Sequence, residues 1–279
     1  MAKYSTPFSL LHAASLLSHK SRLEKFRTSI RHVVTEESIV IDIGTGAGVL
    51  AILAAKAGAN RVIALDINEN SIEYARAVAK QNGVDDRIEF VHSHFGDYYP
   101  SERADVVICE MLSSMMLVEQ QIPAALHANN HMLKEGGFLL PHKVDIYMVP
   151  VECDTMHQRW TFSDISFIPL PQTLDRDQAT DLSKIALVKA FDFTADDIDT
   201  EVDVALSFNI VDDGTVTGFA GMFEACLLPD IKLSMDDGWR DLYLPLKKSL
   251  NAKKGDALQV HLQFSPGEFD TLSIDAEVL

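Results

Sequence analysis

The feature that most constrains this chain is a glycine-rich turn placed directly after an apolar run. Ile39–Ile43 is predicted to be a short buried strand, and residues 49–57 are predicted to be a helix. The turn between them contains Gly44, Gly46 and Gly48. Glycines let the backbone turn tightly and approach a ligand, and the N-terminus of a helix offers free N–H groups. The turn therefore predicts a site for a nucleotide-type ligand between strand and helix.

The spacing of these glycines favours one kind of nucleotide. A dinucleotide-binding turn would place its third glycine at position 49, where this chain has Val49. Here the glycines alternate with other residues, and an acid, Asp42, stands two residues ahead of the first glycine. This pattern is typical of S-adenosylmethionine sites, which have no pyrophosphate to bind. We therefore predict S-adenosyl-L-methionine as the cofactor, in preference to NAD.

Residues at the ends of the following predicted strands complete this site. Asp66 ends a strand, and a carboxylate there can accept hydrogen bonds from both ribose hydroxyls. Ile67 is placed to pack on the adenine face, and Phe95 with Gly96 lies where a loop can close over the adenine edge. The cofactor-binding residues predicted in the turn and at the strand ends are Asp42, Gly44, Thr45, Gly46, Gly48, Leu50, Asp66, Ile67, Phe95 and Gly96. No metal site is predicted, because the histidines are too scattered for a zinc pattern.

The order of predicted elements changes near Pro141. Ahead of it, strand-like and helix-like runs alternate, which predicts a parallel sheet covered by helices on both faces. We expect Asn70 to cap one helix, and another helix to run over residues 122–133 and end at Gly136-Gly137. Beyond Pro141, six or more strand-like runs predict antiparallel pairing in a sandwich or barrel, with residues 212–214 as a turn between paired strands.

Two glutamates bracket an apolar segment after the predicted strand Ala104–Cys109. Glu110 directly follows the strand, at the sheet edge where ligands of open α/β sheets bind, and Glu119 stands nine positions later. Burying two carboxylates is costly unless a cation completes the site, and a planar guanidinium can pair with one on each side. Glu119 by itself also has a simpler interpretation, because acids favour the N-terminus of a following helix.

These residues resemble those of the protein arginine N-methyltransferases, whose double-Glu loop has two glutamates nine positions apart after the fourth strand. Arg22 and Phe26 are similar to the family's Arg-x-x-x-Tyr-x-x-x-Ile helix, whose arginine binds the cofactor carboxylate. Residues 138–147, Trp239 and residues 255–279 resemble the family's passage into its β-barrel, its Thr-His-Trp loop and its closing strands. The resemblance covers nearly the whole chain, which is identified as a divergent member.

The resemblance implies an α/β fold in which a doubly wound, Rossmann-like methyltransferase domain is followed by a mostly antiparallel β-barrel domain. It divides the chain into N-terminal helices that close the cofactor site (residues 1–35), an S-adenosylmethionine-binding domain (36–141) and a β-barrel substrate domain (142–279). It adds Arg22 to the cofactor-binding residues. It also makes the two glutamates the catalytic pair, which would orient an acceptor guanidinium or amine toward the methyl group.

The chain departs from the family pattern around the acceptor. Asp237-Gly238-Trp239 replaces Thr-His-Trp, and His19 stands where the family has an acid facing that histidine. Aromatic positions of the substrate channel and a tyrosine-rich segment near the N-terminus are reduced to Met111, Ser114, Tyr4 and Phe8. Residues 162–181 are short for the family's dimerisation arm, which predicts against its ring-like dimer, although a homodimer stays a candidate assembly.

Charge and composition bear on the partner and the compartment. Lys and Arg number 24 against 41 Asp and Glu, a net charge of −17, which disfavours nucleic acid and favours a basic or arginine-containing protein or peptide. The three cysteines are too far apart for a disulfide framework, and no apolar run reaches membrane-spanning length. Residues 8–17 are apolar but interrupted by His12 and serines, so they predict an amphipathic helix rather than a signal sequence. We therefore expect a cytoplasmic protein that binds no membrane.

Other functions stay open on the sequence alone. A methyltransferase on the same fold could act on another protein side chain, a small molecule or RNA. Methylases of amino groups on bases usually carry an Asn/Asp-Pro-Pro-aromatic tetrad where this chain has Glu110-Met111-Leu112-Ser113, which counts against such bases. A non-catalytic protein that keeps the cofactor pocket as a sensor or scaffold is a third reading, motivated by the missing histidine.

Overall fold

Five parallel strands form the first sheet of the computed structural model, which describes residues 10–195 and 197–279. The strand order is β3-β2-β1-β4-β5, and each neighbouring pair is parallel. The strands are β1 (Ile39–Ile43), β2 (Arg61–Asp66), β3 (Ile88–His92), β4 (Ala104–Cys109) and β5 (Leu133–Leu140), and the helices between them are α3 (Val49–Lys56), α4 (Glu69–Gln81) and α5 (Gln121–His127). The expected doubly wound, Rossmann-like arrangement is confirmed. Because the order reverses between β1 and β4, the carboxyl ends of these two strands are where a ligand binds in such a sheet.

The strands of this sheet are apolar because both faces are covered. All five residues of β1 are buried, and five of the six in β4. In α3, Ala51 and Ala54 are fully buried, and small side chains of this kind let a helix approach the sheet closely. Short apolar runs thus become central parallel strands here, as the pattern predicts.

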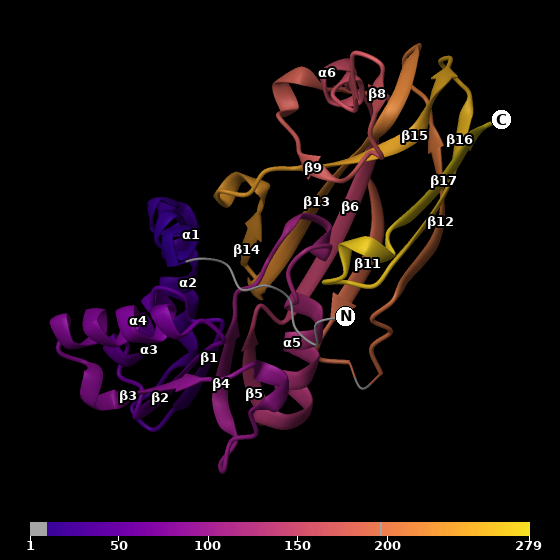
Figure 1. The fold of residues 1–279 in the computed structure, drawn as a ribbon. Coiled ribbons are helices and arrows are strands. Elements are labelled where there is room, and N and C mark those ends of the chain that lie inside the picture. Colours follow the sequence, from indigo (N-terminus) through magenta and orange to yellow (C-terminus); the bar gives the residue numbers. More distant parts are fainter. Residues whose placement is uncertain (1–9, 196) are drawn as a thin grey trace.

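The second half of the chain is antiparallel, as expected, and its strands form two larger sheets (Figure 1). One joins β10-β6-β13-β15-β9, with β11 beside β6 and β14 beside β13, and the other is β12-β16-β17. The longer strands are β6 (Lys143–Glu152), β11 (Ala186–Asp192), β12 (Val202–Asn209), β13 (Gly214–Leu228), β14 (Ile231–Ser234), β15 (Leu242–Ala252), β16 (Ala257–Phe264) and β17 (Ser273–Val278). The turn expected at residues 212–214 does not join paired strands, because β12 pairs with β16 and β13 with β6 and β15.

Short elements fill the segment between β6 and β11. These are α6 (Asp154–Gln158), β7 (Thr161–Phe162), β8 (Ile165–Ser166), β9 (Gln172–Thr173) and β10 (Thr180–Asp181). β7 and β8 pair as a small antiparallel hairpin. Phe162 of β7 and Ile165 of β8 are 74% and 52% exposed, so the hairpin presents apolar side chains to solvent.

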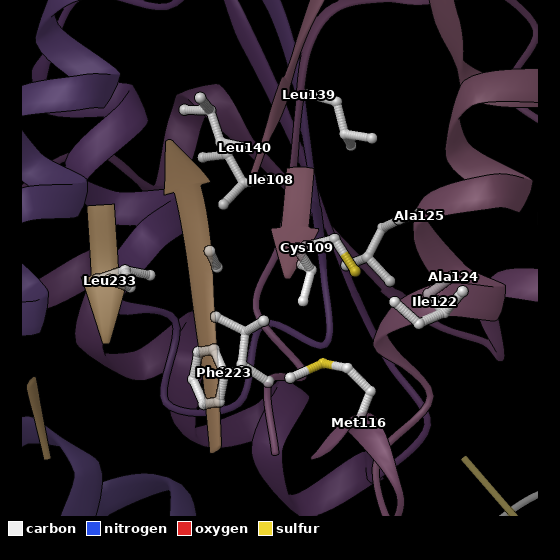
Figure 2. Close-up of a cluster of buried hydrophobic side chains, with 14 of the residues drawn as sticks. Ile108, Cys109, Met116, Ile122, Ala124, Ala125, Leu139, Leu140, Phe223 and Leu233 are labelled. Carbon is white, nitrogen blue, oxygen red and sulfur yellow. The ribbon is translucent and has the colours of Figure 1, made fainter. Parts of the chain in front are cut away.

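One apolar core joins the two halves of the molecule (Figure 2). Ile108 and Cys109 at the end of β4 belong to the same cluster as Phe223 of β13 and Leu233 of β14. Met116, from the loop after β4, also lies in it and is fully buried. The loop that follows β4 is therefore held between the parallel sheet and β13.

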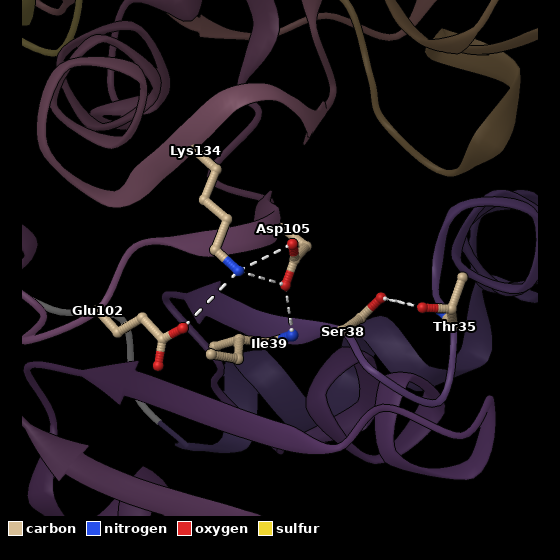
Figure 3. Close-up of polar contacts among 6 residues, drawn as sticks. All are labelled: Thr35, Ser38, Ile39, Glu102, Asp105 and Lys134. Carbon is tan, nitrogen blue, oxygen red and sulfur yellow. Dashed lines mark hydrogen bonds and ion pairs between the residues drawn. The ribbon is translucent and has the colours of Figure 1, made fainter.

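A polar cluster ties the opposite, amino-terminal edge of the parallel sheet together (Figure 3). Asp105 of β4 accepts a hydrogen bond from the backbone N–H of Ile39 at 2.9 Å and one from Lys134 Nζ at 3.0 Å. Beside it, the hydroxyls of Thr35 and Ser38 lie 3.0 Å apart. These contacts join the starts of β1, β4 and β5 at the edge of the sheet opposite their carboxyl ends.

The N-terminal segment forms α1 (Leu10–Ser15), a short 3-10 turn (Leu16–Ser18) and α2 (Lys20–Val33). Within the described part of the helix expected at residues 8–17, the α-helix ends at Ser15 and continues as the 3-10 turn, and it is more exposed than predicted, since α1 has no buried residue and Leu11 is 82% exposed. Tyr4 and Phe8 lie outside the described residues. None of the helices in the described part of the chain is both long and apolar enough to cross a membrane.

Two further local expectations differ from the structure. Asn68 rather than Asn70 caps α4, because its extended backbone lets its Oδ1 accept from the N–H of Asn70 at 3.0 Å. The helix after Glu119 ends in a π-helical turn at Met132, and Gly136-Gly137 lies inside β5, where the pairing with β4 shifts register. The sequence pattern did not predict β15, because the exposed Lys247 and Lys248 break its apolar alternation.

Candidate active site

Asp42 is buried behind the glycine turn and stabilises it by hydrogen bonds. Its Oδ2 accepts hydrogen bonds from Thr45 Oγ1 at 2.6 Å and from the backbone N–H of Ala51 at 3.0 Å. The side chain is only 1% exposed, and this burial raises the pKa of Asp42 to about 7, although both hydrogen bonds oppose the shift. Asp42 therefore links the turn to the first residues of α3, and Leu50 of the same helix is buried in the core.

Gly48 ends the turn at a position that only glycine fits. Its φ is +82°, and a Cβ there would lie 2.8 Å from the Cβ of Ala75 on α4. The left-handed backbone and the close approach both exclude a larger residue. On the other side of the turn, Gly44 lies against the side chain of Met111, which follows Glu110. The glycines thus let α4 and the loop after β4 approach the turn together.

Asp66 stands at the end of β2 and faces the turn. Its Oδ2 accepts from the backbone N–H of Gly46 and its Oδ1 from that of Asn68, both at 2.8 Å. Burial raises the pKa of Asp66, and these two hydrogen bonds oppose the shift. Asp66 is therefore held rigidly beside the glycine turn, while its remaining lone pairs can accept further hydrogen bonds.

The other predicted cofactor residues lie close to these strand ends. Ile67 is half-buried, and its carbonyl oxygen lies 2.9 Å from His92 Nε2. Phe95 and Gly96 form a short turn after β3, in which the N–H of Gly96 donates to His94 Nδ1 at 3.0 Å. The structure therefore brings the loops after β1, β2 and β3 to one edge of the sheet, as the sequence predicts.

Arg22 and Glu110 meet at that edge although they come from different parts of the chain. Arg22 Nη2 lies 3.5 Å from Glu110 Oε2, and the two side chains are 5% and 13% exposed. The Arg22 guanidinium also lies over the ring of Trp239, 4.8 Å from its centroid. Burial raises the pKa of Glu110, and the charge of Arg22 opposes this shift. Arg22 thus supplies the cation that a buried carboxylate here requires.

Glu119 completes a pair of carboxylates. Burial, followed by the charge of Glu110, raises the pKa of Glu119 to about 8. Its backbone N–H donates to Ser113 Oγ at 3.1 Å, which fixes it two residues ahead of α5. Glu119 therefore lies near the start of the helix, as the simpler interpretation has it, and also close enough to Glu110 for the two charges to interact.

The loop between the two glutamates is strained. Met115 and Met116 have positive φ values of 61° and 52°, which L-residues rarely adopt. Contacts from the antiparallel half hold this backbone: Trp239 Nε1 donates to the carbonyl of Leu112 at 2.9 Å, and the N–H of Gly267 donates to the carbonyl of Met116, also at 2.9 Å. These contacts from the second half of the molecule stabilise the loop in its strained conformation.

Two residues that shape this site, Ser113 and Gln121, were given no role by the sequence. Ser113 holds Glu119, and Gln121 Oε1 accepts from the backbone N–H of Met111 at 2.8 Å. Ser114, one of the two positions that depart from the aromatic channel, donates its hydroxyl to the carbonyl of Arg240 at 2.6 Å. A single Ser or Gln in a loop has no periodicity or motif, so only its tertiary contacts reveal the role.

The raised pKa values of Asp42 and Glu119 predict how stability depends on pH. Both carboxyl groups bind a proton more tightly in the folded chain than in the unfolded chain, where their pKa values are the ordinary 3.8 and 4.5. Their contribution to stability is therefore fully present below about pH 4 and is lost as pH rises through about 7 and 8. We expect the free energy of unfolding in urea to fall between pH 5 and pH 9.

The Glu119→Gln variant should show a flatter decline at the upper end of this range. Glu102→Gln is the matched control, since the side chain of Glu102 is 63% exposed. If the wild type and Glu119→Gln declined with the same slope, the assigned burial of Glu119 would be wrong.

The fold and this edge define a class of protein. A parallel sheet in the order β3-β2-β1-β4-β5, a GxGxG turn after β1 and an acid at the end of β2 make a Rossmann-like nucleotide-binding fold. The family model described as ribosomal protein L11 methyltransferase (PrmA) matches residues 24–140, which contain all of these elements. The first half of the chain is therefore similar to a methyltransferase domain.

Individual relatives point to one group within that class. Residues of this chain are 33% identical, over 143 positions, to a probable protein arginine N-methyltransferase 6.1 of Oryza sativa subsp. indica; the match covers 50% of this chain and 37% of that protein. The chain thus matches little more than a third of that relative's length. The fold is similar to those of solved protein arginine methyltransferase structures, two of which superpose on this chain with a TM-score of 0.80.

These two structures extend the likeness of fold to nearly the whole chain. One is the Trypanosoma brucei PRMT1 enzyme-prozyme heterotetrameric complex with AdoHcy, 21% identical, with 94% of this chain and 91% of that chain covered. The other is Arabidopsis thaliana protein arginine methyltransferase 10, 20% identical, with 97% and 93% covered. The resemblance to the protein arginine N-methyltransferases is confirmed, in sequence over half of the chain and in fold over almost all of it.

Proposed function

We propose that this chain is an S-adenosylmethionine-dependent N-methyltransferase that methylates the guanidinium of arginine in a basic protein or peptide. The observation that carries the proposal is the pair of largely desolvated carboxylates, Glu110 and Glu119, both half-buried, next to Arg22 at the carboxyl end of β4. Two acids whose charges interact in a buried place favour a cation between or beside them. A planar guanidinium matches that arrangement better than a point charge does.

The residues around the glycine turn fit the proposed cofactor. Asp66 offers a half-buried carboxylate beside the turn for ribose hydroxyls, and Arg22 offers a buried guanidinium for the carboxylate of the methionine part. Phe95 stands after β3, where the adenine edge would lie. When bound, the cofactor supplies a methyl group on a sulfonium as the electrophile. The cationic sulfonium is favoured electrostatically by an acidic pocket.

Glu110 and Glu119 would act on the acceptor in two ways. As carboxylates they orient the guanidinium and localise its charge away from the attacking nitrogen, and this positioning supplies much of the acceleration. Because the pKa of Glu119 is raised to about 8, one of the pair is also suited to accept the proton that the nitrogen releases, directly or through a water. The charge on an entering guanidinium would at the same time favour ionisation of Glu119.

The overall charge supports a basic macromolecular partner. The chain carries a net charge of −17, which attracts arginine-rich and lysine-rich segments and repels nucleic acid. A homodimer stays a hypothesis, motivated by the exposed apolar side chains of the β7–β8 hairpin. Light scattering that gave the mass of a single chain at all concentrations would exclude it.

The test is transfer of a labelled methyl group from S-adenosylmethionine to an arginine-rich peptide, followed by hydrolysis and separation of methylarginines. We expect label in methylarginine, and none with a peptide in which lysine replaces every arginine. Cofactor bound without any transfer would support the sensor or scaffold instead, which the missing histidine at Gly238 motivates.

A second candidate is methylation of a different side chain in a ribosomal protein or peptide. The match of residues 24–140 to the ribosomal protein L11 methyltransferase family favours it. The same assay distinguishes the two, because label from a lysine-containing peptide would then survive the replacement of its arginines.

A further inference from the structure

The start of α2 is held by a residue more than two hundred positions away. Asp237 Oδ1 accepts from Ser21 Oγ at 2.5 Å, and Asp237 Oδ2 from Lys25 Nζ at 2.6 Å. The same Oδ2 accepts from the backbone N–H of Ser234 at 2.9 Å, which fixes the carboxylate within its own turn. Asp237 is only 2% exposed whereas the Lys25 side chain is 35% exposed, so the contact is buried on the Asp237 side and open to solvent on the lysine side.

The contact places a negative charge near the N-terminus of α2, which has none in its own first turn. The first turn of α2 contains no acidic residue, and His19 ahead of it makes no side-chain capping bond. A helix N-terminus favours a negative charge nearby, and Asp237 brings that charge from the antiparallel half, where it accepts from the side chains of Ser21 and Lys25. The His19 ring itself lies against Gly238, where a Cβ would overlap it and where φ is +112°.

The geometry of the helix connects this contact to the candidate site. Ser21 and Lys25 are four positions apart and so lie on one face of α2, toward Asp237. Arg22, one position after Ser21, faces Glu110. Trp239, two positions after Asp237, lies over the Arg22 guanidinium and donates to the loop between the two glutamates. A shift of α2 relative to the turn at residues 235–239 would therefore move Arg22 away from Glu110.

We propose that Asp237 is a positioning residue, which holds Ser21 and Lys25 so that Arg22 stands ready for the carboxylate of the cofactor. This rests on the proposed function for the identity of the ligand. Asp237 acts through Arg22 and makes no contact with substrate. In this chain it ties α2 to the turn in which Gly238 stands at the family's histidine position.

The first measurement compares two ligands by calorimetry. S-adenosylhomocysteine has the amino-acid carboxylate that Arg22 would bind, and methylthioadenosine lacks it. In Asp237→Asn and Lys25→Met we expect the Kd of S-adenosylhomocysteine to rise about tenfold or more, the order of a hydrogen bond to a charged group, with the Kd of methylthioadenosine unchanged. Asp236→Asn, exposed in the same turn, is the matched control. Equal weakening of both ligands, or of neither, would overturn the proposal.

The second measurement does not depend on any ligand. The chain has two tryptophans, so Trp160→Phe leaves Trp239 as the sole tryptophan, whose emission can be excited selectively over that of the tyrosines. In that background, Ser21→Ala and Lys25→Met should increase acrylamide quenching of Trp239, while Asp236→Asn should not. If the wild type bound neither ligand, the proposed function would fail, and unchanged quenching in both α2 variants would separately refute the role of Asp237.

Discussion

Glu110→Gln is expected to lower the rate of methyl transfer by about 10²–10³-fold while the cofactor still binds. Glutamine keeps the shape of the side chain but removes the charge that would orient the acceptor guanidinium. Cofactor binding should survive, because the contacts that hold α2 and Arg22 in place, from Asp237 to Ser21 and Lys25 and from Trp239 to Arg22, do not involve Glu110. Radiolabel transfer to an arginine-rich peptide measures the first effect, and calorimetry with S-adenosylhomocysteine measures the second.

Glu102→Gln serves as the control for this experiment, since it removes one acidic charge at an exposed position far from β4's carboxyl end. It should retain the turnover of the wild type. Full activity in Glu110→Gln would refute the catalytic assignment, whereas loss of cofactor binding together with turnover would point to a structural defect instead.

Gly48→Ala is expected to destabilise the fold by about 2–4 kcal/mol, the sum of a left-handed backbone penalty and overpacking. The new Cβ would lie 2.8 Å from the Cβ and 3.2 Å from the Cα of Ala75, and neither atom can move without shifting α4. Urea unfolding monitored by circular dichroism measures the change. The same substitution should weaken cofactor binding, because the turn moves with α3.

Gly83→Ala separates the two contributions to this loss. Gly83 also has a positive φ of +67°, but a Cβ there would meet nothing within 4 Å. We expect this variant to lose only about 1 kcal/mol, the cost of the left-handed backbone alone. Equal losses in the two variants would show that the contact with Ala75 has no part in the effect.

The sequence predicts the parallel half of this protein well for a physical reason. A central strand such as β1 must be apolar on both faces, and the GxGxG turn imposes its backbone locally, so both leave patterns within a few residues. The sequence does not determine where a helix begins as well as it determines the strands. Asn68 and Asn70 can both cap α4, and the extended backbone at Asn68 decides between them. The sequence did not predict β14, because it is only four residues long, or β15, because Lys247 and Lys248 break its apolar alternation.

The candidate site divides in the same way. Asp66 ends a strand, and Glu110 and the glycines follow strands directly, so the sequence alone determined that they stand at one edge of the sheet. The tertiary structure decided which of them meet: Arg22 with Glu110, Trp239 with Arg22, and Asp237 with the start of α2. Each of these contacts joins residues separated by many tens of positions. Local periodicity carries no information about such pairs, because they form only when the two halves of the chain pack around one shared core.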